Sequence, residues 1–142
     1  MFIKQVSVFL ENSAGRLQSV LAILKNESIN IVSLSIADNN EYGMLRMIVS
    51  DAEKANDALK KSGFSSHLTD VLAIKLPHTV GSLADVLDRV AKAGINIEYM
   101  YALSTKDANA CIVFKPTNKE DCINALDGIG LNLVTAEEVE NF

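Results

Sequence analysis

The beginning of the chain combines two hydrophobic patterns of different period. In the first stretch every second residue is hydrophobic: Val6, Val8 and Leu10. This alternation predicts a β-strand with one buried face. After the turn ENSAGRL, which carries Gly15, hydrophobic residues recur every three or four positions: Leu17, Val20, Leu21 and Leu24. That spacing is typical of one face of an amphipathic helix, so a glycine-bearing turn is expected to join a strand to a helix.

The rest of the first half predicts four more elements. Residues 30–37 read as a second strand, with Val32, Leu34 and Ile36 on one side. The segment DNNEYG is a turn, and residues 44–49 form a third strand. A helix is expected after Ser50, and a last strand at residues 64–69.

The second half of the chain repeats the first. A shift of 66 positions places Gly15 on Gly81 and the segment INI at residues 29–31 on INI at residues 95–97. The same shift brings the hydrophobic positions of the first strand and helix onto Leu72, Ile74, Leu76, Leu83, Val86, Leu87 and Val90. Further along the shift is 67, which superposes Ser50 on Thr117, Glu53 on Glu120, Leu59 on Leu126 and Gly63 on Gly130. The chain is therefore a duplication whose second copy has gained one residue between Asn96 and Thr117.

Each copy reads strand, helix, strand, strand, helix, strand. This order is that of the ferredoxin-like βαββαβ unit, an α+β fold. We expect two such units in tandem, at residues 1–70 and 71–142, with antiparallel sheets side by side and the helices on one face. A unit of roughly 70 residues is marginal on its own, and no Pro-, Gly- or Ser-rich linker separates the copies near Asp70. The two units are therefore expected to share an interface.

Several polar residues and glycines predict where helices begin and end. Ser13 and Thr79 are expected N-caps of the first helix of each copy. Two capping boxes precede the second helices, Ser50 with Glu53 and Thr117 with Glu120. Gly63 and Gly130 are suited to end those helices. The last strand of the second copy is expected at residues 131–136.

Composition and charge narrow the range of partners. The 142 residues include 13 basic and 18 acidic side chains, a formal net charge of −5, which argues against binding to nucleic acid. No stretch approaches the roughly 18 apolar residues of a membrane span, and the N-terminus does not resemble a signal peptide. The two cysteines, Cys111 and Cys122, fall in a candidate strand and a candidate helix. Lone thiols suit a reducing compartment, so we expect a cytoplasmic protein without contact to membranes.

The stretch ENSAGRL followed by INI resembles the signature of the ACT domain family. The resemblance extends over nearly the whole chain as two copies. It implies regulatory modules that bind amino acids beside metabolic enzymes such as phosphoglycerate dehydrogenase and aspartate kinase. It also implies that modules pair side by side, with an effector between the first turn of one module and the second-strand start of the other.

The residues themselves suit such a ligand. A glycine turn at the start of a helix presents free amides and a positive dipole end, which favour a carboxylate. In serine-binding members of the family the ligand is held by two asparagines, whose positions here are those of Asn12 and Asn30. The candidate site of the first copy comprises Asn12, Ser13, Ala14, Gly15, Arg16, Leu17, Asn30 and Ile31. That of the second copy comprises His78, Thr79, Val80, Gly81, Ser82, Leu83, Asn96 and Ile97.

The second copy departs from the family pattern, and each position has a structural alternative. His78 stands where Asn12 does, and the family's proline before the glycine is replaced by Ala14 and Val80. The glycines could serve only a tight turn, and the asparagines could satisfy backbone groups before a strand. Arg16 could be a solvated side chain and His78 an exposed turn residue. Tyr99 and Tyr101, at the positions of Ser33 and Ser35, are expected on the sheet face away from the helices, either as a partner surface or as a locally buried pair.

No catalytic or metal-binding pattern is present in the sequence. There is no nucleophile elbow, P-loop or dinucleotide fingerprint, and neither His67 nor His78 has metal-ligand spacing to a cysteine. We therefore expect no enzyme, no metal and no cofactor. The expected function is that of a freestanding regulatory protein that binds a small amino acid between two ACT domains and signals to a partner. A homodimer, a metabolic enzyme or both would be that partner, and a constitutive interaction subunit that binds no ligand is the alternative.

Overall fold

The fold is that of two ferredoxin-like units in succession. A computed structural model describes residues 2–39, 41–104 and 109–141. Residues 4–69 and 139–141 form one compact unit, the N-terminal unit, and residues 2–3 and 70–138 form the other, the C-terminal unit. The division falls inside a single strand, β4 (Ser65–Leu76).

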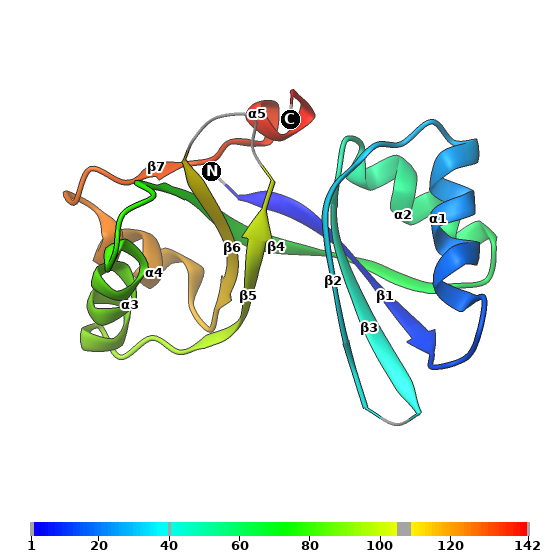
Figure 1. Cartoon of the computed structure of the whole chain (residues 1–142), viewed down its shortest axis with the longest axis horizontal. Coiled ribbons are helices and arrows are strands. Elements are labelled where there is room, and N and C mark those ends of the chain that lie inside the picture. The colour runs from blue at the N-terminus through cyan, green and yellow to red at the C-terminus, as the bar shows by residue number, and fades with distance from the viewer. Residues whose placement is uncertain (1, 40, 105–108, 142) are drawn as a thin grey trace. The chain divides into compact units, whose positions relative to one another are not determined.

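The N-terminal unit has the element order expected from the sequence. Its elements are β1 (Ile3–Glu11), α1 (Arg16–Asn26), β2 (Ile31–Asp38), β3 (Tyr42–Val49), α2 (Ala52–Lys61) and the first part of β4. The strand order is β2-β3-β1-β4, and β3 is antiparallel to both of its neighbours. Both helices lie on one face of the sheet (Figure 1).

The C-terminal unit repeats this plan. It contains the second part of β4, α3 (Ser82–Lys92), β5 (Ile97–Leu103), β6 (Ala110–Pro116), α4 (Lys119–Leu126), β7 (Asn132–Leu133) and the first part of α5 (Ala136–Glu140). The strand order β7-β4-β6-β5 corresponds strand for strand to that of the first unit. β4 is antiparallel to β6 and to β7, and β5 is antiparallel to β6. The ferredoxin-like α+β fold predicted from the sequence is thus confirmed (Figure 1).

Equivalent hydrophobic residues form the core of each unit. In the N-terminal unit the buried cluster includes Val6, Val8, Leu10, Val20, Leu24, Ala55 and Leu59. In the C-terminal unit it includes Leu72, Ile74, Leu76, Val86, Val90, Cys122 and Leu126. These are the positions that the repeat superposes, so the periodicity of the sequence identified the helix-facing side of each sheet correctly.

The last strand of the first copy and the first strand of the second are one element. The sequence predicted two strands here, whereas β4 runs for twelve residues without a break. Asp70, at the division, is held by an ion pair with Lys119 at 2.8 Å. The Lys119 ammonium also lies 4.6 Å from the centre of the Phe2 ring, so a residue from the start of the chain packs in the C-terminal unit.

The strand register locates the residue gained by the second copy. Ala37 pairs with Met44 in the N-terminal unit, and Leu103 pairs with Cys111 in the C-terminal unit. Leu103 follows Ala37 by 66 positions and Cys111 follows Met44 by 67, so the extra residue lies between Leu103 and Cys111. Cys111 is therefore the counterpart of Met44.

The N-caps of the second helix in each copy lie one residue later than expected. Asp51 is the N-cap of α2, and its side chain accepts from the amide of Lys54 at 3.0 Å. Asn118 caps α4 in the same way, accepting from the amide of Asp121. The prediction of Ser50 and Thr117 as caps is wrong, and in the first copy the reason is visible. The Ser50 hydroxyl accepts from the amide of Asn30 at 3.0 Å and is thus already engaged.

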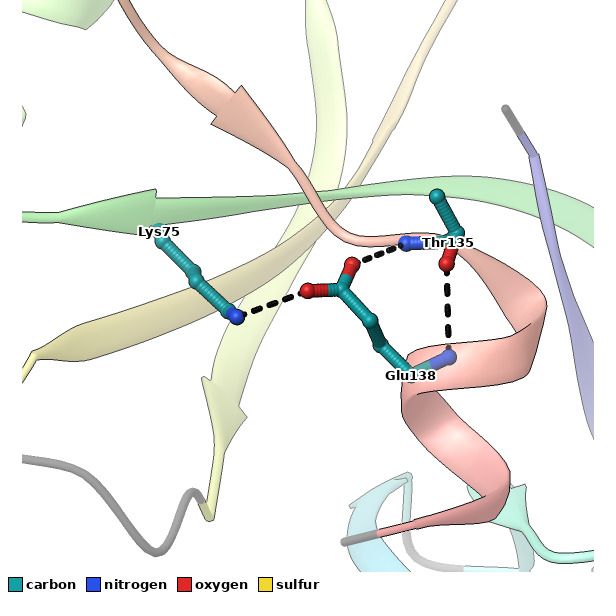
Figure 2. A network of polar contacts seen from close by, with 3 residues as sticks. All are labelled: Lys75, Thr135 and Glu138. Atoms are coloured by element: carbon teal, nitrogen blue, oxygen red, sulfur yellow. Dashed lines mark hydrogen bonds and ion pairs between the residues drawn. The ribbon is translucent and has the colours of Figure 1, made fainter.

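Two predictions for the end of the chain are also wrong. Gly63, with φ 87°, directly follows the end of α2 as expected, but α4 ends at Leu126, well before Gly130. The last strand, expected at residues 131–136, has only two residues, and Thr135 directly precedes α5. The Thr135 amide donates to the Glu138 carboxylate at 2.8 Å, and the Glu138 amide donates to the Thr135 hydroxyl at 3.3 Å (Figure 2). This is a capping box of the form T-x-x-E, a signal that the sequence did contain.

The second strand of the first copy is only partly buried, although one of its sides is hydrophobic. Leu34 pairs with Met47 and Ile36 pairs with Leu45, and both partners on β3 belong to the helix-side core. Leu34 and Ile36 are nevertheless exposed, because β2 is an edge strand.

No helix among the described residues is both long and apolar enough to span a membrane.

Candidate functional site

The same turn occurs before the first helix of each unit. Gly15 has φ 83° and ψ −8°, and Gly81 has φ 90° and ψ −11°. In both turns an amide donates two residues back, Ser13 to the Glu11 carbonyl at 2.9 Å and Thr79 to the Pro77 carbonyl at 2.8 Å. The glycine carbonyls then accept the first full helical hydrogen bonds, each at 3.0 Å. The repeat in the sequence is therefore a repeat in backbone conformation.

The glycines themselves are the N-caps of α1 and α3. Ser13 and Thr79 were expected to cap these helices through their hydroxyls, and that prediction is wrong. Their carbonyls, not their side chains, meet the helix start, accepting from the amides of Arg16 and Ser82 at 3.4 and 3.3 Å. The N-cap position of neither helix provides a side-chain hydrogen bond, because a glycine occupies it. The first-turn amides that follow are the groups an anion would use.

The conformation, not crowding, explains the two glycines. A Cβ built on Gly15 or Gly81 would meet no atom within 4 Å among the described residues. The positive φ angles, in contrast, belong to the left-handed region that glycine adopts without steric cost. The tight-turn explanation therefore accounts for glycine at both positions, and the place where a Cβ would lie is open.

Asn30 and Asn96 are anchored through their backbones. The Asn30 carbonyl accepts from the Ser50 amide at 2.9 Å, and its amide donates to the Ser50 hydroxyl at 3.0 Å. The Asn96 carbonyl accepts from the Thr117 amide at 2.9 Å. These backbone anchors were not predicted from the sequence, although Ser50 and Thr117 superpose in the repeat. The asparagine side chains remain exposed, as do those of Asn12 and His78.

The hydrophobic members of the candidate site belong to the cores. Leu17 and Ile31 pack against the buried cluster of the N-terminal unit, and Leu83 and Ile97 pack against that of the C-terminal unit. They fix the positions of the turns and of the second strands. In the C-terminal unit, the fully exposed Val80 is at the tip of the turn.

Arg16 and Ser82 have the same place in the repeat but different contacts. The Arg16 guanidinium lies 4.7 Å from the centre of the Phe64 ring, a cation–π contact, and its buried Nε has no hydrogen-bond partner among the described residues. Ser82 instead exchanges a hydrogen bond with the Thr79 hydroxyl. Neither expectation for Arg16 included Phe64, because a contact between the two ends of a unit leaves no local signal in the sequence.

The cysteines lie in the interior. Cys111 is in β6 and Cys122 is in α4, and both are buried thiols. Burial raises the pKa of the Cys122 thiol, so it stays protonated and packs as a small hydrophobic residue in the place of Ala55. In the described part of the chain, no three His, Cys, Asp or Glu side chains come together in a way that could hold a metal ion.

The sequence pattern, the fold and the twin turns agree with one family. A family model described as "ACT domain pair" matches residues 1–141. The chain belongs to the ACT domain family. No curated protein matches it.

Solved structures agree with this assignment to an ACT domain pair. The protein BT0572 from Bacteroides thetaiotaomicron is 41% identical, with a TM-score of 0.93 over 100% of this chain and 98% of that one. The regulatory subunit of aspartate kinase from Thermus thermophilus, in its ligand-free form, has a TM-score of 0.62 at 17% identity over 86% and 89% of the two chains. That from Thermus flavus has a TM-score of 0.60 at 19% identity over 86% and 88%. At such identities the two Thermus subunits show a common fold.

Proposed function

We propose that this ACT domain pair is a regulatory protein that binds a small amino acid and passes the signal to a partner. The observation that carries the proposal is the repeated glycine turn, which leaves the helix amides without a side-chain cap and has open space where a Cβ of the glycine would lie. The exposed side chains of Asn12 and Asn30 supply polar groups on the two segments that the ACT family uses for its effectors.

The chemistry of an amino acid matches these groups. Its carboxylate accepts from the first-turn amides of α1 and is stabilised by the positive end of the helix dipole. Its ammonium group needs acceptors, which the side-chain oxygens of Asn12 and Asn30 or backbone carbonyls provide. In the second copy His78 replaces the first asparagine, so we expect the second turn to bind a different amino acid or to bind more weakly.

The effector would act by selecting one arrangement of ACT domains. We place it between the first turn of one ACT domain and the second-strand start of another, as the family resemblance implies. A ligand shifts such an equilibrium only by the difference between its affinities for the two arrangements. The partner that reads this shift would be a second copy of the chain or a metabolic enzyme.

A thermal-shift experiment with a panel of amino acids tests the proposal. A ligand at 100 times its dissociation constant should add about 2.7 kcal/mol to the free energy of unfolding. A protein whose melting temperature responds to no amino acid would instead be a constitutive interaction subunit. That alternative is favoured by the positive φ of Gly15, which requires glycine even without a ligand.

The structure also provides a matched pair of variants. Valine at position 15 would be strained, because a β-branched residue is disfavoured at φ 83°. Asparagine tolerates this conformation, so Gly15→Asn should keep the turn while placing a side chain in front of the helix amides. Gly63→Asn makes the same exchange at φ 87°, after α2 and outside the site. Calorimetry should show at least tenfold weaker binding in Gly15→Asn alone, and equal affinity in both variants would refute the site.

A further inference from the structure

The glycine turn of the first copy is held at the C-terminal end of helix α2. The guanidinium of Arg16, the first residue of α1, lies 4.7 Å from the centre of the Phe64 ring. Phe64 lies between α2 and β4 and is buried in the core of the N-terminal unit. The cation therefore rests on a ring whose own position is fixed by packing.

The start of β2, which carries the second part of the candidate site, is held at the other end of α2. The Asn30 amide donates to the Ser50 hydroxyl at 3.0 Å, and the Ser50 amide donates to the Asn30 carbonyl at 2.9 Å. Ser50 directly precedes Asp51, the N-cap of α2. Both backbone groups of Asn30 are thus engaged, which fixes the point from which its exposed side chain extends.

A third contact joins the end of α1 to the start of α2. The Lys54 ammonium donates to the Glu27 carbonyl at 2.7 Å and lies 3.6 Å from the Glu27 carboxylate. Glu27 is the C-cap of α1, so this cation binds where the end of a helix leaves carbonyls free. The start of α1 is held at the end of α2 and the end of α1 at its start, so the two helices are antiparallel on their face of the sheet (Figure 1).

Two of these three contacts cannot form in the C-terminal unit. The repeat replaces Arg16 and Phe64 by Ser82 and Leu131, and Glu27 and Lys54 by Ala93 and Asp121. The first replacement pair has neither a cation nor a ring. In the second pair a carboxylate takes the place of the ammonium, and a carboxylate cannot donate to a carbonyl. The Ser82 hydroxyl bonds instead to that of Thr79, within its own turn.

The contact at the start of the second strand is only half preserved. The Thr117 amide donates to the Asn96 carbonyl at 2.9 Å, as the Ser50 amide does to that of Asn30. In the part of the chain that the structure describes, however, no hydroxyl accepts from the Asn96 amide. One hydrogen bond therefore holds this segment in the second copy, where two hold it in the first.

We propose that α2 presets the candidate site of the first copy, with Phe64, Lys54 and Ser50 as positioning residues, and that the second copy lacks this support. For its ligand, a small amino acid, the inference rests on the proposed function. A site that is already held in place loses less conformational freedom on binding, so its affinity is higher. The first turn should therefore fill at a lower effector concentration than the second.

NMR relaxation of the ligand-free chain tests the support at the turn. We expect the Nε–H of Arg16 to be nearly as ordered as the backbone, and that of Arg89, an exposed arginine of α3, to be mobile. Phe64→Leu introduces the residue that the repeat carries at Leu131, and it should make Arg16 mobile. Phe114→Leu makes the same exchange in the core of the C-terminal unit and should not. A wild-type Arg16 as mobile as Arg89, or one that Phe64→Leu leaves ordered, would overturn the proposal.

Amide exchange tests the support at the start of β2. Asn30 and Asn96 both lie in an INI segment, so their intrinsic exchange rates are alike. We expect a protection factor at least tenfold higher for the Asn30 amide, because only this amide donates to a hydroxyl. Ser50→Ala should remove most of that difference, whereas Thr117→Ala should leave Asn96 unchanged. Equal protection of the two amides in the wild type would contradict the proposal.

Calorimetry with the twenty proteinogenic amino acids as probes relates this support to binding. For the amino acid that binds the wild type most tightly, we expect at least fivefold weaker binding in Phe64→Leu and a smaller loss in Lys54→Met. The controls Phe114→Leu and Lys92→Met, the latter at an ion pair within α3, should stay within twofold of the wild type. Unchanged affinity in Phe64→Leu would overturn the proposal. A wild type that binds none of the twenty would refute the proposed function instead, and the two ligand-free measurements would then decide whether α2 holds the segments.

Discussion

The two ACT domains share a backbone plan and differ in what their equivalent residues contact. The two turns have equivalent internal backbone hydrogen bonds, and the φ and ψ angles of their glycines are nearly the same. Yet Arg16 lies on the ring of Phe64, while Ser82 bonds to Thr79. On the sheet face away from the helices, Phe9 is exposed, while Lys75 is engaged by Glu138.

This difference separates what the duplication had to keep from what it could change. Core residues and turn glycines are constrained by packing density and by the sign of φ, which leave few substitutes. Polar and surface positions have no such constraint, so the copies diverged there. Residues at equivalent places in the repeat are therefore natural controls for each other.

The largest expected effect tests whether the two cores are equivalent. Leu59→Ala and Leu126→Ala remove the same side chain from the second helix of each unit. Leu59 is fully buried and Leu126 is 6% exposed, so we expect a loss of about 3 kcal/mol in unfolding free energy for the first and less for the second. Urea denaturation measures both losses. A greater loss in Leu126→Ala would show that burial does not determine which of the two variants loses more stability.

Smaller changes in stability, of opposite sign in the two copies, are expected for variants at the ends of α1 and α3. Gly94 follows α3 with φ 74°, and the residue at the same place in the first copy is Ser28 with φ 58°. A side chain in this left-handed conformation costs about 1 kcal/mol. Gly94→Ser should therefore destabilise the protein by about that amount, and Ser28→Gly should stabilise it by up to the same amount. Thermal unfolding of both variants checks the signs, and two shifts in the same direction would contradict the comparison.

The displaced caps give a third contrast. Asp51→Ala and Asn118→Ala each remove the side chain that accepts from the third amide of a helix, so each should lose about 1 kcal/mol. Glu53→Ala and Glu120→Ala, at the glutamates of the expected capping boxes, are the controls and should lose less. Chemical denaturation of the four variants measures this. If the glutamate variants lost as much as the cap variants, the caps assigned to Asp51 and Asn118 would be incorrect.

The smallest effect concerns α5, whose Glu138 forms an ion pair with Lys75. The first copy has Phe9 at the position of Lys75 and therefore lacks this ion pair. The hydrogen bond from Lys75, and then that from the Thr135 amide, hold the pKa of Glu138 below its ordinary value. The unfolded chain thus takes up this proton at a higher pH than the folded chain. The stabilisation is complete above the ordinary glutamate pKa of about 4.3 and is lost as pH falls through the lowered value. Because the Glu138 side chain is 40% exposed to solvent, we expect only local loosening, visible as lower amide-exchange protection factors in α5 at acid pH. Glu138→Gln should lack this transition, and its persistence there would assign it to another group.

Most of the fold was accessible from the sequence because hydrophobic periodicity is a local signal. The alternation at Val6, Val8 and Leu10 and the spacing from Leu17 to Leu24 were sufficient to order the elements. Helix ends were less predictable, because Ser50 and Asp51 are both good caps and the choice depends on the contact between Ser50 and Asn30. The exposure of Leu34 was not predictable for a related reason, since an edge position is a property of the whole sheet.

The residues of the candidate site also differ in how well they could be predicted from the sequence. The turn glycines were correctly assigned to the helix starts, because positive φ leaves a clear residue preference. The partner of Arg16 was not predicted, because Phe64 comes from the far end of the unit. Whether Asn12 and Asn30 meet a ligand remains a prediction for the experiments above.

Strand β4 closes the sheet of one copy and opens that of the next. Because side chains along a strand alternate between its two sides, one added residue near Asp70 would turn every inward residue of one half outward. A change of length by an odd number of residues at the junction therefore inverts one half unless a β-bulge absorbs it, whereas the β5–β6 connection, where the duplication did gain its residue, carries no such penalty.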